Sequence, residues 1–323
     1  MGYVSKKGEI VLFGVETTYG TISSSINRIV GEVTNFSAPT YNKKLSLDHQ
    51  LSTTDPSSFK QGVQEYTGGK IEVVFRRGDI FEYVVGAATD SSVGSAYDHT
   101  LDTDDILSSI SIAKGYYDST GTIVTREVYL GSVITAIGVS CKKGENVTLS
   151  VSFDCASVTS DSTTISASYF SDDPILYKGS TLTITPSGSS ATTVSTITNF
   201  SMNFKREVAT AEVLNSFIVA HKDLGNWSSD VSFDYYFIDK DELDIFQGGS
   251  GSQDSEAIEC ALDFTVTNEL TGADERTIKI SSSSSKLGNF NFGDDGGFVT
   301  GKLVGILKSF QMVFTDDTAN WDA

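Results

Sequence analysis

The residues able to do chemistry are few and scattered along this chain of 323 residues. The three histidines, His49, His99 and His221, lie far apart, and none belongs to the H-E-x-x-H or H-x-H patterns that bind zinc. The acidic run Asp102–Asp105 lacks the glycine and the closing glutamate of a calcium-binding EF-hand loop. The sequence therefore predicts no metal site, no cofactor and no histidine-based catalytic centre.

Other reactive patterns are equally incomplete. The segment Gly14–Gly20 has two glycines but lacks the Lys-Ser/Thr pair of a phosphate-binding loop, and the G-x-S-x-G turn of a serine hydrolase does not occur. Cys141, Cys155 and Cys260 are an odd number without C-x-x-C spacing, which favours buried free thiols; a Cys141–Cys155 disulfide is the alternative. We therefore predict a protein that is not an enzyme, with a jelly-roll hydrolase as a remote alternative.

The charge of the chain limits the partners that it can bind. The sequence has 23 Lys and Arg against 42 Asp and Glu, a net charge of −19. Residues 1–165 carry 13 basic and 19 acidic residues, a net of −6, and the remaining residues carry 10 and 23, a net of −13. Because both parts are acidic, tight binding to nucleic acids or anionic lipids is not expected.

No targeting or membrane segment is evident in the sequence. No apolar run approaches the roughly 20 residues of a membrane-spanning helix, and the first residues lack the apolar core of a signal peptide. We expect synthesis in a cytoplasm and no membrane partner.

Alternation of apolar and polar residues is the dominant pattern and predicts strands. In Val147–Cys155 every odd position is apolar and every even position polar, and Leu262–Thr267 shows the same period of two. The segment Val133–Cys141 is also typical of a strand, and Lys142–Asn146 supplies turn residues. These segments predict a long hairpin with Cys141 beside its turn and Cys155 at the far end of the second strand.

A helix is predicted at two places only. After the strand Lys70–Phe75, the segment Asp79–Gly86 has Asp79 as a candidate N-cap, Glu82 three residues later, and a closing glycine. Its apolar residues Ile80, Phe81, Val84 and Val85 would share one face. The second helix is predicted over Asp241–Gly248.

These segments also indicate an internal duplication. The helical segments align at an offset of 162 residues, and Thr34–Ser37 recurs as Thr198–Ser201 at an offset of 164. The Ser/Thr-rich stretch Ser157–Ser171 lies where the copies would meet. We predict two tandem domains, residues 1–160 and 161–323.

The predicted fold class is all-β, with each repeat a β-sandwich or partial barrel and one short flanking helix. The stretches Gly248–Ser252 and Ser281–Ser285 are predicted to be loops, and Gly293–Gly297 a hairpin turn.

Several short motifs resemble one protein family. Gly14–Thr21 resembles the G-x-E-x-x-Y-G-T opening of the major tail tube proteins of long-tailed bacteriophages and related archaeal viruses. Tyr97–Leu101 and Leu107–Ile112 are similar to the Y-x-H-T and L-P-S-L-T-I segments of that family, with Ser108 in place of the usual proline. The hairpin through Phe153, with Gly144 as its turn glycine, is similar as well. The likeness covers residues 9–160, and the predicted repeat extends it to the second half.

The resemblance implies a structural virion protein. In that family, six β-sandwich domains form a ring whose inner sheet lines a DNA channel, and the rings stack into the tail. A duplicated chain would form the ring as a trimer with pseudo-six-fold symmetry. The expected partners are further copies of the chain, other tail proteins, and viral DNA that passes without specific binding. The expected location is the virion tail.

Inter-subunit contacts are expected at two places from the resemblance. They are the N-terminal segment with Glu16 and Tyr19, and the hairpin turn with Gly144 and Glu145. Trp321, close to the end of the chain, is a further candidate for anchoring a neighbouring subunit. The net negative charge has two interpretations, a channel wall that repels DNA phosphates or a subunit kept soluble before assembly.

A binding module is the alternative from a different functional class. A virion decoration protein or a carbohydrate-binding adhesin would use exposed aromatic residues such as Trp227 and Trp321. Binding to glycans without self-assembly would favour that alternative.

Overall fold

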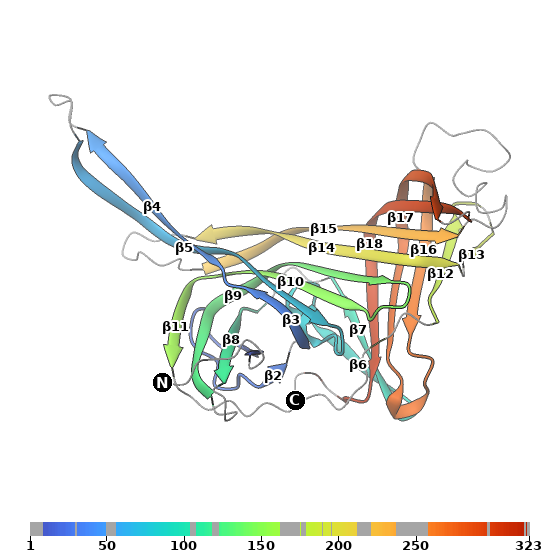
Figure 1. Cartoon of the computed structure of the whole chain (residues 1–323), viewed down its shortest axis with the longest axis horizontal. Helices are drawn as coiled ribbons and strands as arrows, with labels where there is room; N and C mark the ends of the chain where they lie inside the picture. The colour runs from blue at the N-terminus through green and yellow to red at the C-terminus, as the bar shows by residue number, and fades with distance from the viewer. Residues whose placement is uncertain are drawn as a thin grey trace.

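A computed structural model of the chain is almost entirely built of antiparallel strands (Figure 1). It describes residues 9–29, 31–49, 56–103, 108–117, 123–161, 175, 179–188, 190–194, 196–211, 221–236, 258–295, 298–319 and 321. Within these residues no α-helix occurs, and the helical segments are the 3-10 turns η2 (Asp79–Tyr83) and η3 (Gly272–Asp274). The predicted all-β fold class is confirmed.

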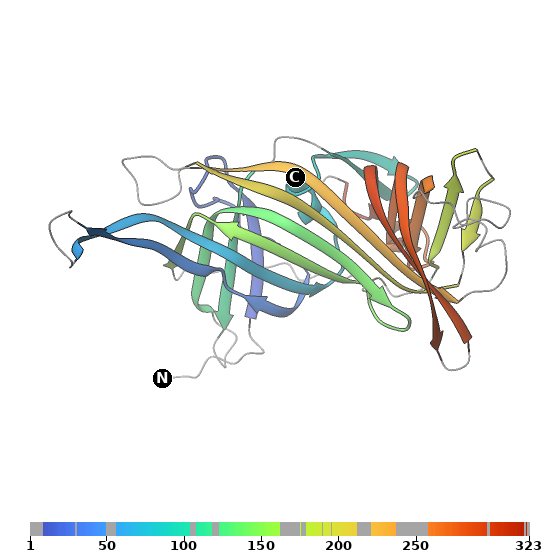
Figure 2. The same cartoon turned by 90° about the horizontal axis from the view of Figure 1, so that it is seen from above.

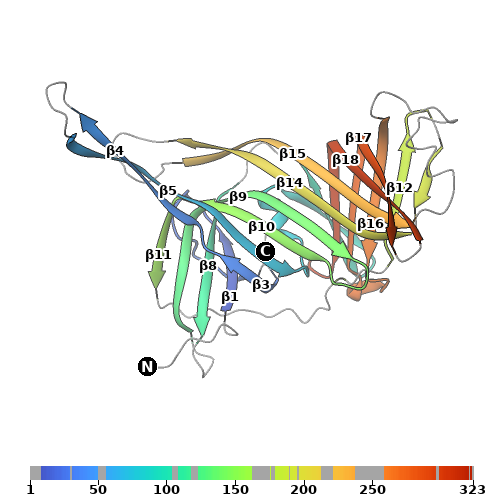
Figure 3. The same cartoon turned by 45° about the horizontal axis from the view of Figure 1, so that its top comes forward.

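One long sheet runs through the molecule, and we call it the spanning sheet (Figures 1 and 3). In spatial order its strands are β3 (Glu32–Ser37) and β4 (Thr40–His49), both paired with β5 (Pro56–Val74), then β10 (Thr148–Cys155), β9 (Ile123–Lys142), β14 (Ile197–Ala211), β15 (His221–Tyr236), β18 (Phe298–Asp316) and β17 (Thr277–Asp295). Only the C-terminal part of β9 and β17 and the N-terminal part of β18 belong to it.

Two further sheets pair with the remaining parts of these long strands. The first flanking sheet has the order β2 (Arg28–Ile29), β1 (Glu9–Val15), β8 (Ile110–Tyr117), β9 and β11 (Ser157–Asp161). The second has the order β13 (Thr192–Val194), β12 (Thr181–Pro186), β16 (Ile258–Thr267), β17, β18, β7 (Ala96–Asp102) and β6 (Ala88–Val93). Because β9, β17 and β18 each serve two sheets, all the strands form one connected system.

The hydrophobic core follows from the alternation in the strands. Along β10, Leu149, Val151, Phe153 and Cys155 are buried while the residues between them are more exposed, as predicted. The buried apolar residues of the spanning sheet face the flanking sheets in both halves of the chain. Because β9 and β14 pair directly, these residues form one continuous core that extends from the first half into the second. The thiols of Cys141, Cys155 and Cys260 are buried and free. The predicted hairpin of β9 and β10 is confirmed, with Ser140 paired to Thr148.

The predicted N-terminal helix is corrected in length and in its cap. It is a five-residue 3-10 turn, Asp79–Tyr83, preceded by Gly78, and no side chain caps its N-terminus. Asp79 lies inside the turn and is buried, with an oxygen 3.5 Å from Nη2 of Arg77. Its apolar residues are buried as predicted. The second predicted helix, Asp241–Gly248, and the predicted loop Gly248–Ser252 lie outside the described residues.

The predicted loop Ser281–Ser285 is wrong, because these residues belong to β17. The strand crosses here from the second flanking sheet to the spanning sheet, with two register shifts relative to β18. The serine hydroxyls find acceptors here: the Ser282 hydroxyl is shared between the carbonyls of Ser284 and Ser309, Ser285 donates to the carbonyl of Cys260, and Ser284 donates to the carboxylate of Glu259. A run of serines is therefore compatible with a strand that bends. Further along, β17 and β18 pair as far as Asp295 and Phe298, so Gly293–Asp295 of the predicted turn Gly293–Gly297 belong to the strand, and residues 296–297 lie outside the described residues.

Strand order and bulges recur between the two parts of the chain. The order β3/β4, β5, β10, β9 matches β14, β15, β18, β17, and the order β2, β1, β8, β9, β11 matches β13, β12, β16, β17, β18. The register shift after Val33 of β3 recurs after Ile197 of β14. The shift after Ser152 of β10 recurs after Val304 of β18. Bulges seldom coincide by chance because each adds one residue at a defined place. The boundary between residues 160 and 161 stays a prediction, since most of its surroundings lie outside the described residues.

Candidate assembly interface

The two parts of the chain join edge to edge between β9 and β14. Seven residues, Asn199–Lys205, pair with Ala136–Lys142 in antiparallel register. Phe200, Met202 and Phe204 are buried on the core side. On the opposite side, a Cβ atom at Gly138 would lie 2.8 Å from Oδ1 of Asn203, so glycine leaves room for that amide. The junction is thus an ordinary ladder of backbone hydrogen bonds sealed by a packed apolar face.

The two outer edges of the spanning sheet are formed by strands equivalent to those that meet at this junction. β3 and the start of β4 correspond to β14, and the end of β17 corresponds to the end of β9. Among the described residues, no strand pairs with the outer edge of β3, and Asn289–Asp295 of β17 pair with β18 on one side only. Unpaired edges of this kind accept strands from other chains.

At the far end of the β14–β15 hairpin, residues 206–211 and 221–227 form a ribbon that lies on the first part of the chain, and we call them the docked arm (Figure 1). Arg206 is 6% exposed, and its guanidinium donates hydrogen bonds to the carbonyls of Val84 (3.1 Å) and Val85 (3.3 Å), next to η2. It also donates to Gly225 of the same arm, at 3.1 Å. A buried guanidinium is tolerated because these carbonyls accept its protons.

Two more contacts hold the tip of the docked arm. Nζ of Lys222, a residue 3% exposed, lies 3.7 Å from Oδ2 of Asp154. The ring of His221 meets the ring of Tyr19 edge to face, with centroids 5.0 Å apart. The sequence analysis missed Arg206 and Lys222. A signal for Arg206 exists, since it follows Phe204 at the next core-facing position of β14.

The corresponding ribbon of the first part, formed by β4 and the start of β5, extends away from the body of the molecule (Figures 1 and 2). We call residues 41–49 and 56–66 of this hairpin the projecting arm. At its base, the rings of Tyr41 and Tyr66 lie 4.9 Å apart and Tyr41 is exposed. Both arms contain a register shift, after Lys43 in the projecting arm and after Arg206 in the docked arm. When the two arms are aligned by their pairing, the two shifts differ in position by one residue. The two arms are therefore the same structural element in different surroundings.

Glu16, predicted as an inter-subunit contact, is a buried hydrogen-bond acceptor within the chain. Its carboxylate accepts hydrogen bonds from the backbone of Gly20 (2.9 Å) and Gly131 (2.8 Å) and from the hydroxyls of Ser109 (2.7 Å) and Ser111 (2.8 Å). Gly131 has a φ of +60° in the middle of β9, where the strand passes between sheets. Glu16 therefore ties β1 to the bend of β9.

Tyr19 lies over the same bend. A Cβ atom at Gly131 would be 2.9 Å from both the Tyr19 ring and Cβ of Ala156. Burial is the main cause that raises the pKa of the Tyr19 hydroxyl. The motif that carried the family resemblance thus has a structural role within the subunit, and its predicted contact with a neighbour stays a prediction.

The other predicted contact residues lie at different depths. Gly144 has a φ of +81° at the exposed β9–β10 turn, which favours glycine, and the Glu145 amide donates to the Lys142 carbonyl at 2.9 Å. Trp321 is 2% exposed, so it is buried within its own chain. Trp227 packs edge to face on Phe310, at 4.8 Å. Neither tryptophan offers the exposed ring that a sugar-binding platform needs.

Trp321 belongs to a cluster around a buried histidine. The ring of His99 stacks on the Trp321 ring with centroids 4.0 Å apart, and the indole donates to Oδ2 of Asp316 at 3.0 Å. Nδ1 of His99 lies 2.7 Å from Asp90, and Nε2 lies 3.0 Å from Asp316. Burial lowers the pKa of His99, but the two carboxylates reverse this effect and the pKa is raised. The cluster ties the end of the chain to β6 and β7.

The outward face of the spanning sheet carries small polar side chains, the exposed lysines Lys142, Lys205 and Lys302, and several paired carboxylates. The amides of Asn203 and Asn199 donate to Asp230 (2.8 Å) and Asp234 (2.9 Å). Glu72 accepts from Lys70 at 2.6 Å, and this hydrogen bond is the main cause that lowers the pKa of Glu72. Half-buried serines lie between these pairs at positions 140, 150, 152, 201 and 232. The acidic excess of the chain is not concentrated as unpaired carboxylates on these residues.

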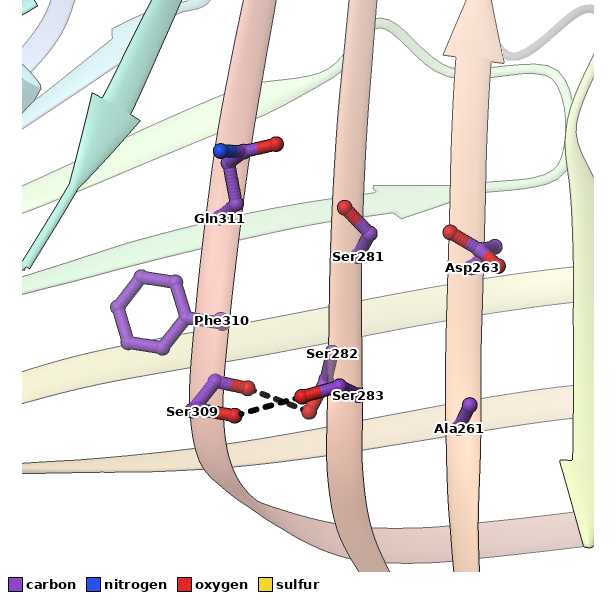
Figure 4. A pocket seen from close by; sticks show the side chains of 8 residues that line it. All are labelled: Ala261, Asp263, Ser281, Ser282, Ser283, Ser309, Phe310 and Gln311. Atoms are coloured by element: carbon purple, nitrogen blue, oxygen red, sulfur yellow. Dashed lines mark hydrogen bonds between the residues drawn. The ribbon is translucent and has the colours of Figure 1, made fainter.

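A shallow groove lies on β16, β17 and β18 (Figure 4). It is lined by Ala261, Asp263, Ser281, Ser282, Ser283, Ser309, Phe310 and Gln311. The serine hydroxyls are engaged, since Ser282 donates to the Ser309 carbonyl and Ser283 lies 3.2 Å from the Ser309 hydroxyl. No histidine lines the groove, and its one acidic side chain is Asp263, which is paired with Ser281 across β16 and β17.

The remaining candidates for chemistry do not come together. His99 is buried in its cluster and His221 lies on the docked arm. His49 is placed in β4, Asp104 and Asp105 lie outside the described residues, and no group of metal-binding side chains gathers in the part searched. Within the described chain, no helix has the length and apolar character needed to cross a membrane.

Comparison with known proteins agrees with the architecture. The model of a family described as phage tail tube protein matches residues 9–298. A search of curated proteins found no significant match. The match extends well beyond residue 160, so it includes the docked arm and most of the second part of the chain.

Proposed function

The chain belongs to the phage tail tube protein family, and on that premise we propose that it closes into rings of three chains that stack into a tube for viral DNA. As a family member it is a structural component of the virion tail.

The β9–β14 junction serves as the template for ring closure. Within the chain, Ser140 of β9 pairs with Ser201 of β14. The recurring registers make Gly293 of β17 the counterpart of Ser140, and Ser37 of β3 the counterpart of Ser201. We therefore expect β17 of one chain to pair with β3 of the next, with Gly293 opposite Ser37. The recurrence of the pairing registers in the two parts of the chain is the observation that supports the proposal most directly.

Repetition of this join turns the spanning sheet into a closed wall. Each chain contributes two similar stretches of the sheet, so the ring of six modules that the sequence resemblance implies needs three chains. Closure covers both unpaired edges, and a heterologous interface that closes on itself yields a ring instead of an open filament.

The outward face of the spanning sheet is the proposed DNA channel wall, because its other face is packed against the flanking sheets. On this face, paired carboxylates and serine hydroxyls alternate with the exposed lysines Lys142, Lys205 and Lys302. Because charges of both signs are interspersed, the wall would neither retain the duplex as a purely basic surface does nor repel it as a purely acidic one does. The overall charge of −19 then acts mainly on solubility before assembly.

A disulfide at the proposed join tests ring closure. Ser37→Cys combined with Gly293→Cys should crosslink neighbouring chains in assembled protein, giving covalent dimers and trimers on a non-reducing gel. The nearest atom to a new Cβ at Gly293 is the Thr300 hydroxyl, at 2.7 Å, which can rotate away. Burial raises the pKa of the native thiols Cys141 and Cys155 to about 12, so they should remain unreactive.

The intrachain junction provides the matched control. Ser140→Cys with Ser201→Cys should form a disulfide within one chain and leave the monomer mass unchanged. Electron microscopy of the same samples would count the chains in a ring. Rings without the Ser37–Gly293 crosslink would contradict the proposed join, and protein that stays monomeric at all concentrations would contradict the proposed function.

A further inference from the structure

The docked arm and the projecting arm are equivalent, yet of the described residues of the two arms only those of the docked arm rest on another part of the molecule (Figures 1 and 2). We propose that the projecting arm of one chain lies across the second part of the neighbouring chain in the ring, as the docked arm lies across the first part of its own chain. The inference rests on the proposed function, because it needs the neighbour that ring closure provides.

Ring order places the projecting arm in the right position. The docked arm belongs to the part that begins with β14, and it lies on the part that supplies β9 to the junction. At the proposed join, β3 takes the place of β14 and the neighbour's β17 takes the place of β9. The projecting arm, which continues from β3 through β4, would then extend over the neighbour in the same direction.

The surface that would receive the arm can be located by register. Asp154, the partner of Lys222, is paired with Val133 of β9, and its counterpart Ile306 is paired with Lys286 of β17. Ile306 is 63% exposed, the highest value among the large apolar residues described as exposed. One exposed isoleucine is ordinary on a protein surface. This one, however, occupies the position that the docked arm covers in the first part of the chain.

The projecting arm places a lysine at the matching position. His221 and Lys222 pair with Ala211 and Thr210 in the docked arm. In the projecting arm, Lys60 pairs with Ser46. The offset of 162 residues between β5 and β15 makes Lys60 the counterpart of Lys222. We therefore expect Lys60 to approach Ile306 of the neighbouring chain, where the lysine stem can cover the apolar side chain.

The first experiment maps the contact in assembled tubes. A photo-crosslinking amino acid at Ile306 should label residues 56–63 of another copy, which mixing of isotopically light and heavy chains distinguishes from labelling within one chain. Leu270, an exposed apolar residue in the connection after β16, is the matched control position and should not label the arm. Label from Ile306 in any other segment, or only within its own chain, would overturn the inference.

A charge exchange gives a second, independent readout. Ile306→Asp recreates the chemistry of the Lys222–Asp154 pair and should leave the concentration needed for assembly nearly unchanged. Ile306→Lys brings two lysines together and should raise that concentration about tenfold, although it lowers the net negative charge. Adding Lys60→Glu to Ile306→Lys should restore assembly.

The outcomes separate this inference from the proposed function. Rings that form normally with Ile306→Lys, or a lack of rescue by Lys60→Glu, would overturn the arm contact while ring closure stands. A wild-type protein that forms no rings would contradict the proposed function and the arm contact together. Circular dichroism of the monomeric variants confirms that each substitution leaves the fold intact.

Discussion

The Nε2 atom of His99 lies 3.0 Å from Oδ1 of Asp316, although 217 residues separate them in the chain. The opposite ring nitrogen lies 2.7 Å from Asp90. A neutral imidazole can donate only one hydrogen bond, so two carboxylates at these distances favour the doubly protonated, positively charged ring. Burial acts to raise the pKa of Asp316, but the hydrogen bonds from His99, Thr318 and Trp321 together with the charge of His99 outweigh it, and the pKa is lowered. A charged latch thus holds the end of the chain.

The latch predicts a defined pH dependence of stability. Because the pKa of folded His99 is raised, its contribution is complete below about pH 6.5 and is lost as the pH rises through the folded value. Because the pKa of Asp316 is lowered, its contribution is complete above about pH 4 and is lost as the pH falls further. Thermal unfolding should therefore show that His99→Gln destabilises the protein more at pH 6 than at pH 9.

Nuclear magnetic resonance titration provides the direct check on this latch. His99 should titrate above pH 6.5, and Asp316→Asn should lower its pKa. An equal destabilisation by His99→Gln at both pH values would contradict the charged latch.

Glu16 should be sensitive to removal of its charge. Glu16→Gln places an amide nitrogen against groups that all donate hydrogen bonds, so at least one buried donor loses its acceptor. We expect a loss of about 2–3 kcal/mol in the free energy of unfolding, measured by urea denaturation. Glu145→Gln at the exposed turn should change it by less than about 0.5 kcal/mol. Equal effects of the two substitutions would show that the Glu16 network contributes little.

Two glycines with similar backbone conformations allow the cost of backbone strain to be separated from the cost of steric contact when glycine is replaced by alanine. Gly131 and Gly144 have φ values of +60° and +81°. A Cβ atom at Gly131 would meet Tyr19 and Ala156 at 2.9 Å, whereas one at Gly144 meets no atom within 4 Å. Alanine at Gly144 should cost about 1 kcal/mol through backbone strain. Alanine at Gly131 should cost clearly more, and calorimetry showing the same melting temperature for both would refute the steric contribution.

Arg206 should control the attachment of the docked arm. Arg206→Met retains much of the aliphatic stem but loses the hydrogen bonds to the carbonyls of Val84 and Val85. We expect amide hydrogen exchange in residues 206–211 and 221–227 to accelerate by at least tenfold while β10 remains protected. Lys205→Met, at the exposed neighbouring position, is the matched control. Unchanged exchange in the arm would show that packing alone holds it.

The strands were predictable because each carries its own pattern. The alternation in Val147–Cys155 predicts a strand with one buried face. The turn residues Lys142–Asn146, which precede this strand, place Cys141 beside the turn of the hairpin. Asp79–Gly86 was harder, because apolar residues at Ile80, Phe81, Val84 and Val85 fit an α-helix and a 3-10 turn equally well. The serine run was misjudged because its composition does not reveal the backbone carbonyls that accept the hydroxyl protons.

The assembly surfaces could be predicted only in part. The motif around Glu16 was found, but its partners Ser111 and Gly131 are more than 90 residues away in the chain. The arms were missed because their equivalence is visible in pairing registers and not in residue identity. A long-range ladder such as Phe314 to His99 follows from no local pattern.

The pairing of β7 with β18 has a consequence for how the chain can be divided. Gln311–Asp316 at the end of the polypeptide take their neighbours from Tyr97–Asp102 near its beginning. A gene split between residues 160 and 161 would therefore encode two fragments. The C-terminal fragment would lack β7, the strand that pairs with β18, because β7 belongs to the N-terminal fragment. Co-expression of both fragments, and not either alone, should be needed to recover soluble material.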